Sequence, residues 1–318
     1  MPYNGERRNA GKDRPGMAAQ KKSSWRDDFS AGIERDGWAE AIAVLDSQKT
    51  GHAGTPRQAV KLQAAKIMSR HYGEGTAGLY EAATAFAGSE SEGAQEVGLV
   101  LLGPMFGHNP AEVTGIIFRL ADSENWEVRE WAASALRRVI SENFAAIFPT
   151  VREWAGHDSP NVRRAAAVAS GSAAGSCTEE ACRMLLEALT PLLEDDDPYV
   201  RKNLGAFAIG GGFLKAQPAL VADWLGRASD HPRAQWNAAM ALSAAEAANC
   251  LELLSGLLDQ LAADERTVVR RAVYRAVLNL AKRVPEEVIP MVQAWKDDPA
   301  RCHVYSRVKE KMGASGNL

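Results

Sequence analysis

Trp126 and Glu130 are the two residues whose types and spacing could do chemistry. They stand four residues apart in the stretch Asp122–Arg138, DSENWEVREWAASALRR, and this spacing places both side chains on one face of a helix. A carboxylate stabilises a positive charge that develops beside it, and the face of an aromatic ring attracts the same charge. The alternative is that neither residue has a chemical role: Trp126 packs at a junction between helices, and Glu130 is a solvated surface residue.

The helix that carries this pair is one copy of a unit that repeats along the chain. When Val128-Arg129 is used as a ruler, related helices appear at steps of 34, 34, 34, 38, 34 and 35 residues. The positions equivalent to Arg129, which we call ruler positions, are Lys61, Gln95, Arg129, Arg163, Arg201, Gln235 and Arg270. A fixed period of this size is typical of stacked units that bury their apolar faces against their neighbours, as in a solenoid.

Each unit is expected to contain two helices, the second of which begins just before a ruler position. The predicted first helices are 78–87, 110–121, 144–155, 179–193, 218–228, 250–262 and 285–295. The pattern D-x-x-x-V-R-x-x-A-x-x-A-L, clearest over Val128–Leu136 and Val162–Ala169, resembles the HEAT and HEAT-like families. We therefore predict an all-α, right-handed HEAT-like repeat solenoid of about seven helix pairs. The resemblance implies that the arginine after the valine is a scaffold residue.

Length and composition agree with a single repeat array. The chain has 318 residues, of which 46% are hydrophobic and 24% are charged, which is typical of a soluble helical protein. We expect a disordered basic tail over residues 1–24, one repeat domain over 25–312 that begins with a capping segment, and a frayed end over 313–318. The sequence has no membrane-spanning apolar run, no secretory signal and no CxxC among its four cysteines. We therefore expect a cytoplasmic protein with reduced thiols.

The net charge of −3 hides an uneven distribution. Residues 1–24 carry six Lys or Arg and two acids, whereas residues 270–318 carry ten Lys or Arg and five acids. The middle of the chain is therefore acidic. This asymmetry is compatible with DNA lying along one face of the solenoid, and an acidic solvated surface would give the same distribution.

The second helices of a HEAT-like stack line its concave surface, so the residues one, five and eight places after each ruler position form one stripe. In the later repeats this stripe holds Arg164, Lys202, Trp236, Met240, Arg271 and Arg275. Cations beside a shallow groove suit a phosphate backbone, and an acidic protein partner would suit them nearly as well. The glycine triplet at 210–212 is interpreted as a helix end and a loop, with close approach of a large ligand as the alternative.

An ordered series of short motifs narrows the resemblance. The motifs are Asn125-Trp126-Glu127-Val128-Arg129-Glu130, Phe148-Pro149, Trp154, Asn161-Val162-Arg163-Arg164-Ala165-Ala166, Tyr199-Val200-Arg201-Lys202 and Lys215-Ala216-Gln217-Pro218. In order and spacing they resemble the AlkC/AlkD-like DNA alkylation repair family, over about Glu124 to Trp224. The resemblance implies a superhelix that holds duplex DNA on its concave face. In the AlkD branch it also implies a glycosylase that excises cationic bases such as 3-methyladenine and 7-methylguanine.

By this resemblance, Trp126 corresponds to a tryptophan that packs against the sugar of the lesion, and Glu130 stands where the family has a catalytic aspartate. Cleavage of the N-glycosidic bond builds positive charge on the sugar, so a nearby carboxylate stabilises the transition state more than the ground state. The sequence departs from the family at Ala206, where a second tryptophan is expected. Phe207 is beside it and, in an α-helix, would point about 100° away.

We therefore predict a protein that binds duplex DNA and excises cationic alkylpurines, with Trp126 and Glu130 as catalytic residues. The predicted DNA-contact residues are Arg163, Arg164, Lys202, Arg271 and Arg275, although Arg163, as a ruler arginine, is first interpreted as a scaffold residue. We expect a monomer that does not bind membranes. Because the six histidines are scattered and no phosphate-binding loop is present, we expect no metal and no cofactor. The alternatives are a non-catalytic DNA-binding relative and a HEAT-repeat scaffold for a protein partner.

Overall fold

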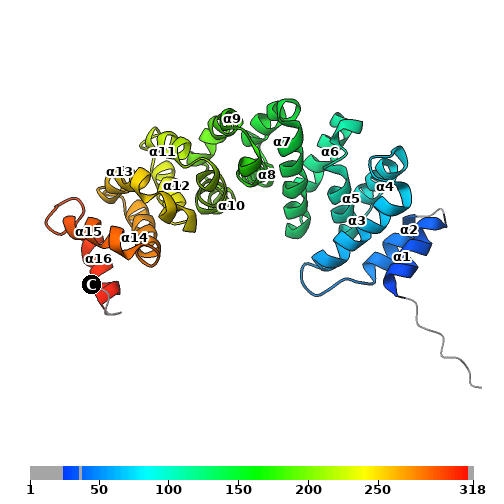
Figure 1. Ribbon diagram of the computed structural model, residues 1–318, viewed down its shortest axis with the longest axis horizontal. Coiled ribbons are helices and arrows are strands. Elements are labelled where there is room, and N and C mark those ends of the chain that lie inside the picture. The colour runs from blue at the N-terminus through cyan, green and yellow to red at the C-terminus, as the bar shows by residue number, and fades with distance from the viewer. Residues whose placement is uncertain (1–23, 36–37, 314–318) are drawn as a thin grey trace, which may run out of the picture.

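Two rows of helices build an arch. The computed structural model describes residues 24–35 and 38–313. The predicted basic tail lies outside these residues except for Ser24, which caps the first helix, and the predicted frayed end lies outside them except for Gly313. Within the described residues, the helices follow one another along the arch from α1 to α16, and the first and second helices of each pair form its outer and inner rows (Figure 1). The predicted all-α solenoid is confirmed.

The helix pairs match the predicted repeat with two differences. The first helices are α2 (Trp38–Asp46), α4 (Ala77–Gly88), α6 (Pro110–Ala121), the second half of α7 (Trp126–Ala155), α9 (Glu179–Leu189), α11 (Pro218–Gly226) and α13 (Leu251–Ala262). The second helices are α3 (Gln58–Tyr72), α5 (Glu92–Leu102), the first half of α7, α8 (Pro160–Ala173), α10 (Pro198–Asn203) with the π-helix η4 (Leu204–Leu214), α12 (Pro232–Leu242) and α14 (Thr267–Ala281). Helix α1 (Trp25–Glu34) precedes these pairs, and α15 (Pro285–Ala294) and α16 (Cys302–Gly313) follow them. The differences are that the first pair takes its first helix, α2, from the predicted capping segment, and that the predicted first helix 285–295 is α15, which follows the last of the seven described pairs. Short 3-10 segments lie at Phe106–His108, Ala174–Ser176, Thr190–Glu194 and Ala245–Cys250.

Helix α7 joins two repeats in one element. Asn143 has a non-helical backbone (φ −136°, ψ 39°), so the chain bends there, and the first helix of the next pair begins at the predicted place. Pro149 lies within this second half. The predicted capping segment holds two helices, α1 and α2, which are separate and pack against each other.

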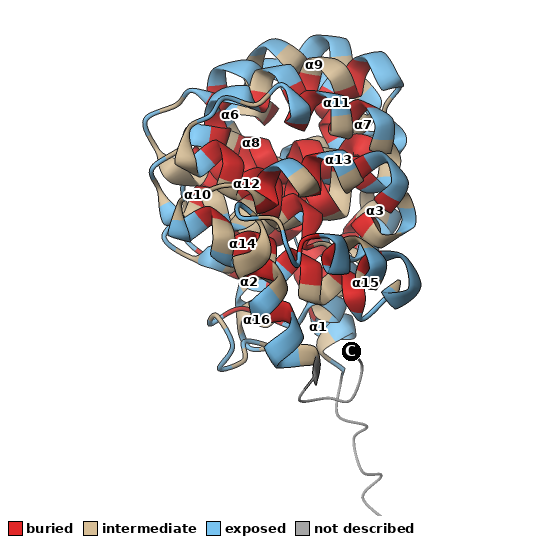
Figure 2. Ribbon diagram, turned by 90° about the vertical axis from the view of Figure 1, so that its left-hand side faces the viewer, coloured by how far each residue is buried: buried red, intermediate tan, exposed pale blue. Residues whose placement is uncertain are grey.

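The core runs along the arch between the two rows, and Figure 2 shows the buried residues inside and the exposed residues on the outside. Much of it is alanine on the second helices, which lets neighbouring helices approach closely. No single described helix is long and apolar enough to cross a membrane, and the segments Pro232–Leu242 and Ala245–Ala262 reach that length only as a pair bent by 80°.

The Val-Arg dipeptide has the same role in several repeats. The valines before the ruler arginines, Val128, Val162, Val200 and Val269, are fully buried. The ruler side chains other than Lys61 bond the carbonyl six residues upstream, in the turn before their own helix. Examples are Arg129 Nη1 to Ser123 O at 2.7 Å, Gln235 Nε2 to Ser229 O at 2.8 Å and Arg270 Nε to Asp264 O at 2.7 Å. The predicted scaffold role of these residues is therefore visible as a repeated bond between a side chain and a turn.

The glycine triplet does not end a helix. It lies inside η4, where the hydrogen bonds span five residues rather than four. Gly212 packs directly on α8, since a Cβ added to it would lie 2.3 Å from the carbonyl oxygen of Gly171. A Cβ added to Gly171 would in turn lie 2.5 Å from the carbonyl oxygen of Ala208. The interpretation as a cap and loop was wrong for this triplet, because close packing of two second helices requires the small residues.

Gly212→Ala is expected to lower the free energy of unfolding by about 1 to 3 kcal/mol, because the clashing atoms are backbone and no rotamer change relieves them. Gly211→Ala is the matched control, since its Cβ would have its nearest neighbour, Ala206 O, at 3.7 Å. Urea unfolding of the two variants measures the difference. Equal stabilities would show that α8 and η4 can separate without penalty.

Candidate nucleic-acid interface

Trp126 is held at the surface at the start of α7. Asn125 caps this helix by accepting a hydrogen bond from Glu127 N at 2.9 Å, and its Nδ2 donates to Ala53 O at 2.8 Å. The second bond holds the loop between α2 and α3 beside the helix start, where His52 meets the Trp126 ring edge-on at 5.2 Å. The indole remains 43% exposed. Trp154 and Trp224, by contrast, are buried.

Glu130 lies one turn after Trp126 and is paired rather than free. Its carboxylate accepts a hydrogen bond from Arg164 Nη2 of the next second helix, α8. The Glu130 side chain is 42% exposed, whereas the Arg164 side chain is only 3% exposed. The repeat pattern predicted that both residues lie on the concave stripe. It did not predict that they form an ion pair with each other.

Arg164 is packed among other side chains. Its guanidinium lies over the Tyr199 ring at 5.2 Å, and Arg129 lies over the same ring at 5.3 Å. Its Nε and Nη1 are buried and have no hydrogen-bond partner among the described residues. The buried charge of Arg164 therefore depends mainly on Glu130, and its guanidinium is not presented to a phosphate on the concave surface.

Arg163 is also occupied by the protein. Its Nη1 donates to the carbonyls of His157 and Asp158, each at 2.8 Å. Its Nε and Nη2 donate to the carboxylate of Asp195 at 2.6 and 3.1 Å. The Asp195 hydrogen bond is the largest cause that raises the pKa of Arg163 above its usual value. This geometry favours the scaffold interpretation of Arg163 over a DNA contact.

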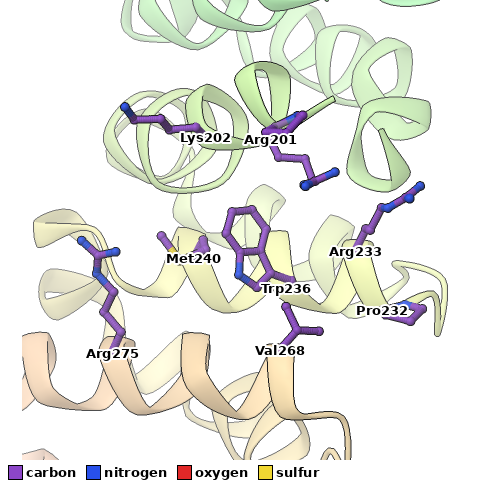
Figure 3. A pocket seen from close by; sticks show the side chains of 9 residues that line it. Arg201, Lys202, Pro232, Arg233, Trp236, Met240, Val268 and Arg275 are labelled. Carbon is purple, nitrogen blue, oxygen red and sulfur yellow. The ribbon is translucent and has the colours of Figure 1, made fainter. Parts of the chain in front are cut away.

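Lys202, Arg271 and Arg275 are different, because they are exposed and have no hydrogen-bond or ion-pair partner among the described residues. Lys202 and Arg275 face one groove of about 650 Å³ between α10, α12 and α14. Its lining residues are Pro198, Arg201, Lys202, Pro232, Arg233, Trp236, Met240, Val268 and Arg275. Figure 3 shows the indole of Trp236 in the middle of this groove, with Lys202 and Arg275 on one side and Arg233 on the other. We call it the Trp236 groove.

A buried charge cluster was missed by the sequence reasoning. Lys61 is fully buried, and its Nζ lies 2.6 Å from Glu96 Oε2, 2.7 Å from Glu127 Oε1 and 3.0 Å from Thr55 Oγ1. Glu96, which occupies the stripe position of Glu130 one repeat earlier, is fully buried rather than solvated. The available signal was the lysine at a ruler position where the other repeats have Arg or Gln.

The two carboxylates of this cluster have opposite pKa shifts. Burial raises the pKa of Glu96 to about 7, although its contact with Lys61 acts in the other direction. Burial also acts to raise the pKa of Glu127, but hydrogen bonds from Lys61 and Thr55 outweigh it and lower the pKa. Because Glu127 directly follows Trp126, the cluster anchors the start of α7 and with it the exposed indole.

The direction of the Phe207 side chain could not be predicted by assuming an α-helix. It lies in the π-helix η4, whose hydrogen bonds enclose one more residue than those of an α-helix, so directions counted at 100° per residue do not apply. Its side chain is 54% exposed. It lines a second groove, of about 710 Å³, with Gly171 of α8 and Gly211 of η4. An exposed aromatic ring therefore lies next to Ala206, the position where the resemblance led us to expect a second tryptophan.

One comparison with known proteins supports the repeat class for part of the chain. A family model described as HEAT repeats matches residues 113–202. The crystal structure of YibA from Escherichia coli is 17% identical, with a TM-score of 0.38, and the alignment covers 92% of this chain and 99% of that one. The structure of smu.31 from Streptococcus mutans UA159 is 14% identical, with a TM-score of 0.32, and covers 90% and 98%. No curated protein matches the sequence. The chain therefore contains HEAT repeats over residues 113–202, within an all-α solenoid.

Proposed function

We propose that the concave face binds duplex DNA through its phosphates. The observation that carries this proposal is the contrast between two sets of cations. The ruler arginines are engaged by turn carbonyls, whereas Lys202, Arg271 and Arg275 are exposed and unpartnered among the described residues. Exposed cations that follow one surface neutralise phosphates and release counterions, which supplies sequence-independent affinity.

Several acids of the same repeats are paired with cations or hydrogen-bonded to the backbone, and the net charge of −3 belongs to the whole chain. Asp195 pairs with Arg163, and Asp264 pairs with Arg266. Asp197 accepts hydrogen bonds from backbone N–H groups at the start of α10. No acidic residue lines the Trp236 groove. The local charge, rather than the average charge, sets attraction for a polyanion.

Base excision is the second candidate function. It is supported by the exposure of Trp126 and Glu130 on neighbouring turns of one helix face, and by the resemblance of the Glu124–Trp224 segment to the DNA alkylation repair family. In this proposal the carboxylate faces the positive charge that develops on the sugar of a cationic alkylpurine nucleotide. The ion pair with Arg164 reduces the net charge available there, so catalysis depends on how far substrate binding releases Glu130.

Simultaneous Lys202→Ala, Arg271→Ala and Arg275→Ala substitutions are expected to weaken binding to duplex DNA and to reduce the slope of log K against log salt by about 2 to 3, close to one per lost phosphate contact. Fluorescence anisotropy over a salt series measures both quantities. The control removes Arg152, Lys296 and Arg227, three exposed cations in or directly after α7, α15 and α11, outside the second helices of the concave face; Arg227 pairs with Asp223 and Glu187.

Equal losses in the two triple variants would contradict binding on the concave face. The length of the duplex gives a second criterion, because a surface that spans several repeats requires a minimum number of base pairs. A protein scaffold with an acidic partner would show no such length threshold on DNA.

A further inference from the structure

The Trp236 groove leaves an apolar surface uncovered among cations. The Trp236 indole is half-buried, and its N–H has no hydrogen-bond partner among the described residues. The indole N–H groups of Trp38, Trp224 and Trp295, in contrast, donate to Tyr72, Thr190 and Asp259. Beside Trp236 lie Met240 on the same helix and Val268 of α14, which is 48% exposed. The groove thus offers a ring face and an apolar floor that the chain itself does not use.

The cations stand on two sides of this ring (Figure 3). Lys202 of α10 and Arg275 of α14 are unpartnered on one side. Arg233 lies on the other side and makes one hydrogen bond, from Nη1 to Glu194 O at 3.2 Å, which leaves its other N–H groups available. Arg201 has its Nη1 on the turn carbonyls of Asp195 and Asp196, so it frames the groove without offering all of its donors.

This order of charge, ring and charge matches the repeat of a nucleic-acid strand, in which each base lies between two phosphates. Every nucleobase has a flat π-face that can stack on an aromatic side chain whatever the sequence. An acidic peptide would supply the negative charges but no regular planar group for the indole. The groove volume of about 650 Å³ is within the range of sites that hold small organic groups.

We propose that the Trp236 groove holds one unpaired nucleotide of a DNA strand, whose base stacks on Trp236 and whose flanking phosphates contact Lys202 and Arg275 on one side and Arg233 on the other. This inference rests on the proposed binding of DNA to the concave face. It adds a preference: the protein selects duplexes in which a nucleotide has left the helix, because that base can reach the indole.

The expected effect is a preference of about tenfold or more for a duplex with a single-nucleotide bulge over the fully paired duplex, since stacking on an aromatic side chain contributes on the order of 1 to 3 kcal/mol per base. Anisotropy titrations at one salt concentration give the ratio of the two affinities. In Trp236→Ala the ratio is expected to fall to about one, whereas Trp236→Phe keeps a preference because a phenyl ring still stacks.

Trp236→Ala could lose its preference for the bulged duplex through a folding defect, so a second measurement detects stacking directly. With 2-aminopurine as the bulged base, binding of the wild-type protein is expected to quench its fluorescence, and Trp236→Phe is expected to quench it less. Circular dichroism and thermal unfolding verify that each variant retains the helical fold.

The possible negative results distinguish a failure of the proposed DNA binding from a failure of the proposed nucleotide site. If the wild type binds neither duplex, the proposed function itself is contradicted. If it binds both duplexes with equal affinity and leaves the fluorescence unchanged, DNA binding stands and the nucleotide site is overturned. Tight binding of free dAMP with no preference between the duplexes would also overturn the inference, because the groove would then be a site for a free mononucleotide.

Discussion

Lys61→Met is expected to lower the free energy of unfolding by about 3 to 5 kcal/mol at pH 8, because it removes the cation from a buried cluster and strands two carboxylates. The Nζ of Lys61 lies 2.6 Å from Glu96 and 2.7 Å from Glu127, and the lysine and Glu96 side chains are fully buried. Lys66→Met is the matched control, since Lys66 is exposed on the same helix. Urea unfolding measures both variants, and similar losses would contradict the assigned role of the cluster.

The pH dependence gives this prediction a second signature. The pKa of Glu96 is raised from 4.5 to about 7 in the folded protein, so the folded state holds a proton that the unfolded state has lost over this range. The stabilising contribution of Glu96 is therefore present below pH 4.5 and is lost as the pH rises to about 7. In Lys61→Met the stranded carboxylate can protonate at low pH, so the destabilisation should be smaller at pH 5 than at pH 8.

Replacement of the whole cluster separates the removal of a charge from the loss of packing. Lys61→Met combined with Glu96→Met and Glu127→Met leaves neither a buried charge nor an unpaired buried amide, and replacement of a buried ion cluster by apolar residues of similar volume is often nearly neutral. We expect the triple variant to recover most of the lost stability and to lack the pH dependence between 5 and 8. A triple variant as unstable as Lys61→Met would assign the effect to packing around Trp131, whose ring lies 5.4 Å from Lys61 Nζ.

The repeat was predictable because each unit carries the same local requirements. Val128, Val162, Val200 and Val269 must be buried, and the arginine after each of them must satisfy carbonyls of the preceding turn, so a dipeptide marks these four second helices. The first-helix boundaries followed from the same period. The pairing of charges was not predictable in this way. Glu130 bonds Arg164, 34 residues away, and Lys61 bonds Glu127, 66 residues away, and such partners depend on how the repeats stack.

Two local features of the backbone were also predicted wrongly from the sequence. Gly212 was interpreted through the role of glycine at helix ends, whereas its function is to allow α8 and η4 to touch backbone to backbone. Phe207 was assigned a direction from α-helical geometry, which the π-helix changes. Both failures have the same origin, because a tertiary contact between neighbouring helices determined the backbone, and the period of a single helix does not contain that information.

Glu130→Gln is expected to slow the release of methylated purines from alkylated duplex DNA by at least about tenfold under single-turnover conditions, equivalent to about 1.4 kcal/mol of transition-state stabilisation. This expectation rests on the proposed base excision. A neutral amide of similar shape cannot stabilise the positive charge that builds on the sugar. Glu142→Gln is the matched control, because Glu142 is exposed on the same helix and pairs only with Arg138 among the described residues.

Glu130→Gln also leaves the buried guanidinium of Arg164 without its carboxylate, so loss of rate alone is ambiguous. Arg164→Met resolves the ambiguity. If Glu130 acts on the substrate, removal of its cationic partner leaves a half-exposed carboxylate with a stronger field, and base release should be retained or faster. The double variant should then be as slow as Glu130→Gln. If Arg164→Met is instead as slow as Glu130→Gln, the ion pair acts as a structural unit between α7 and α8, and the carboxylate has no separate part in catalysis.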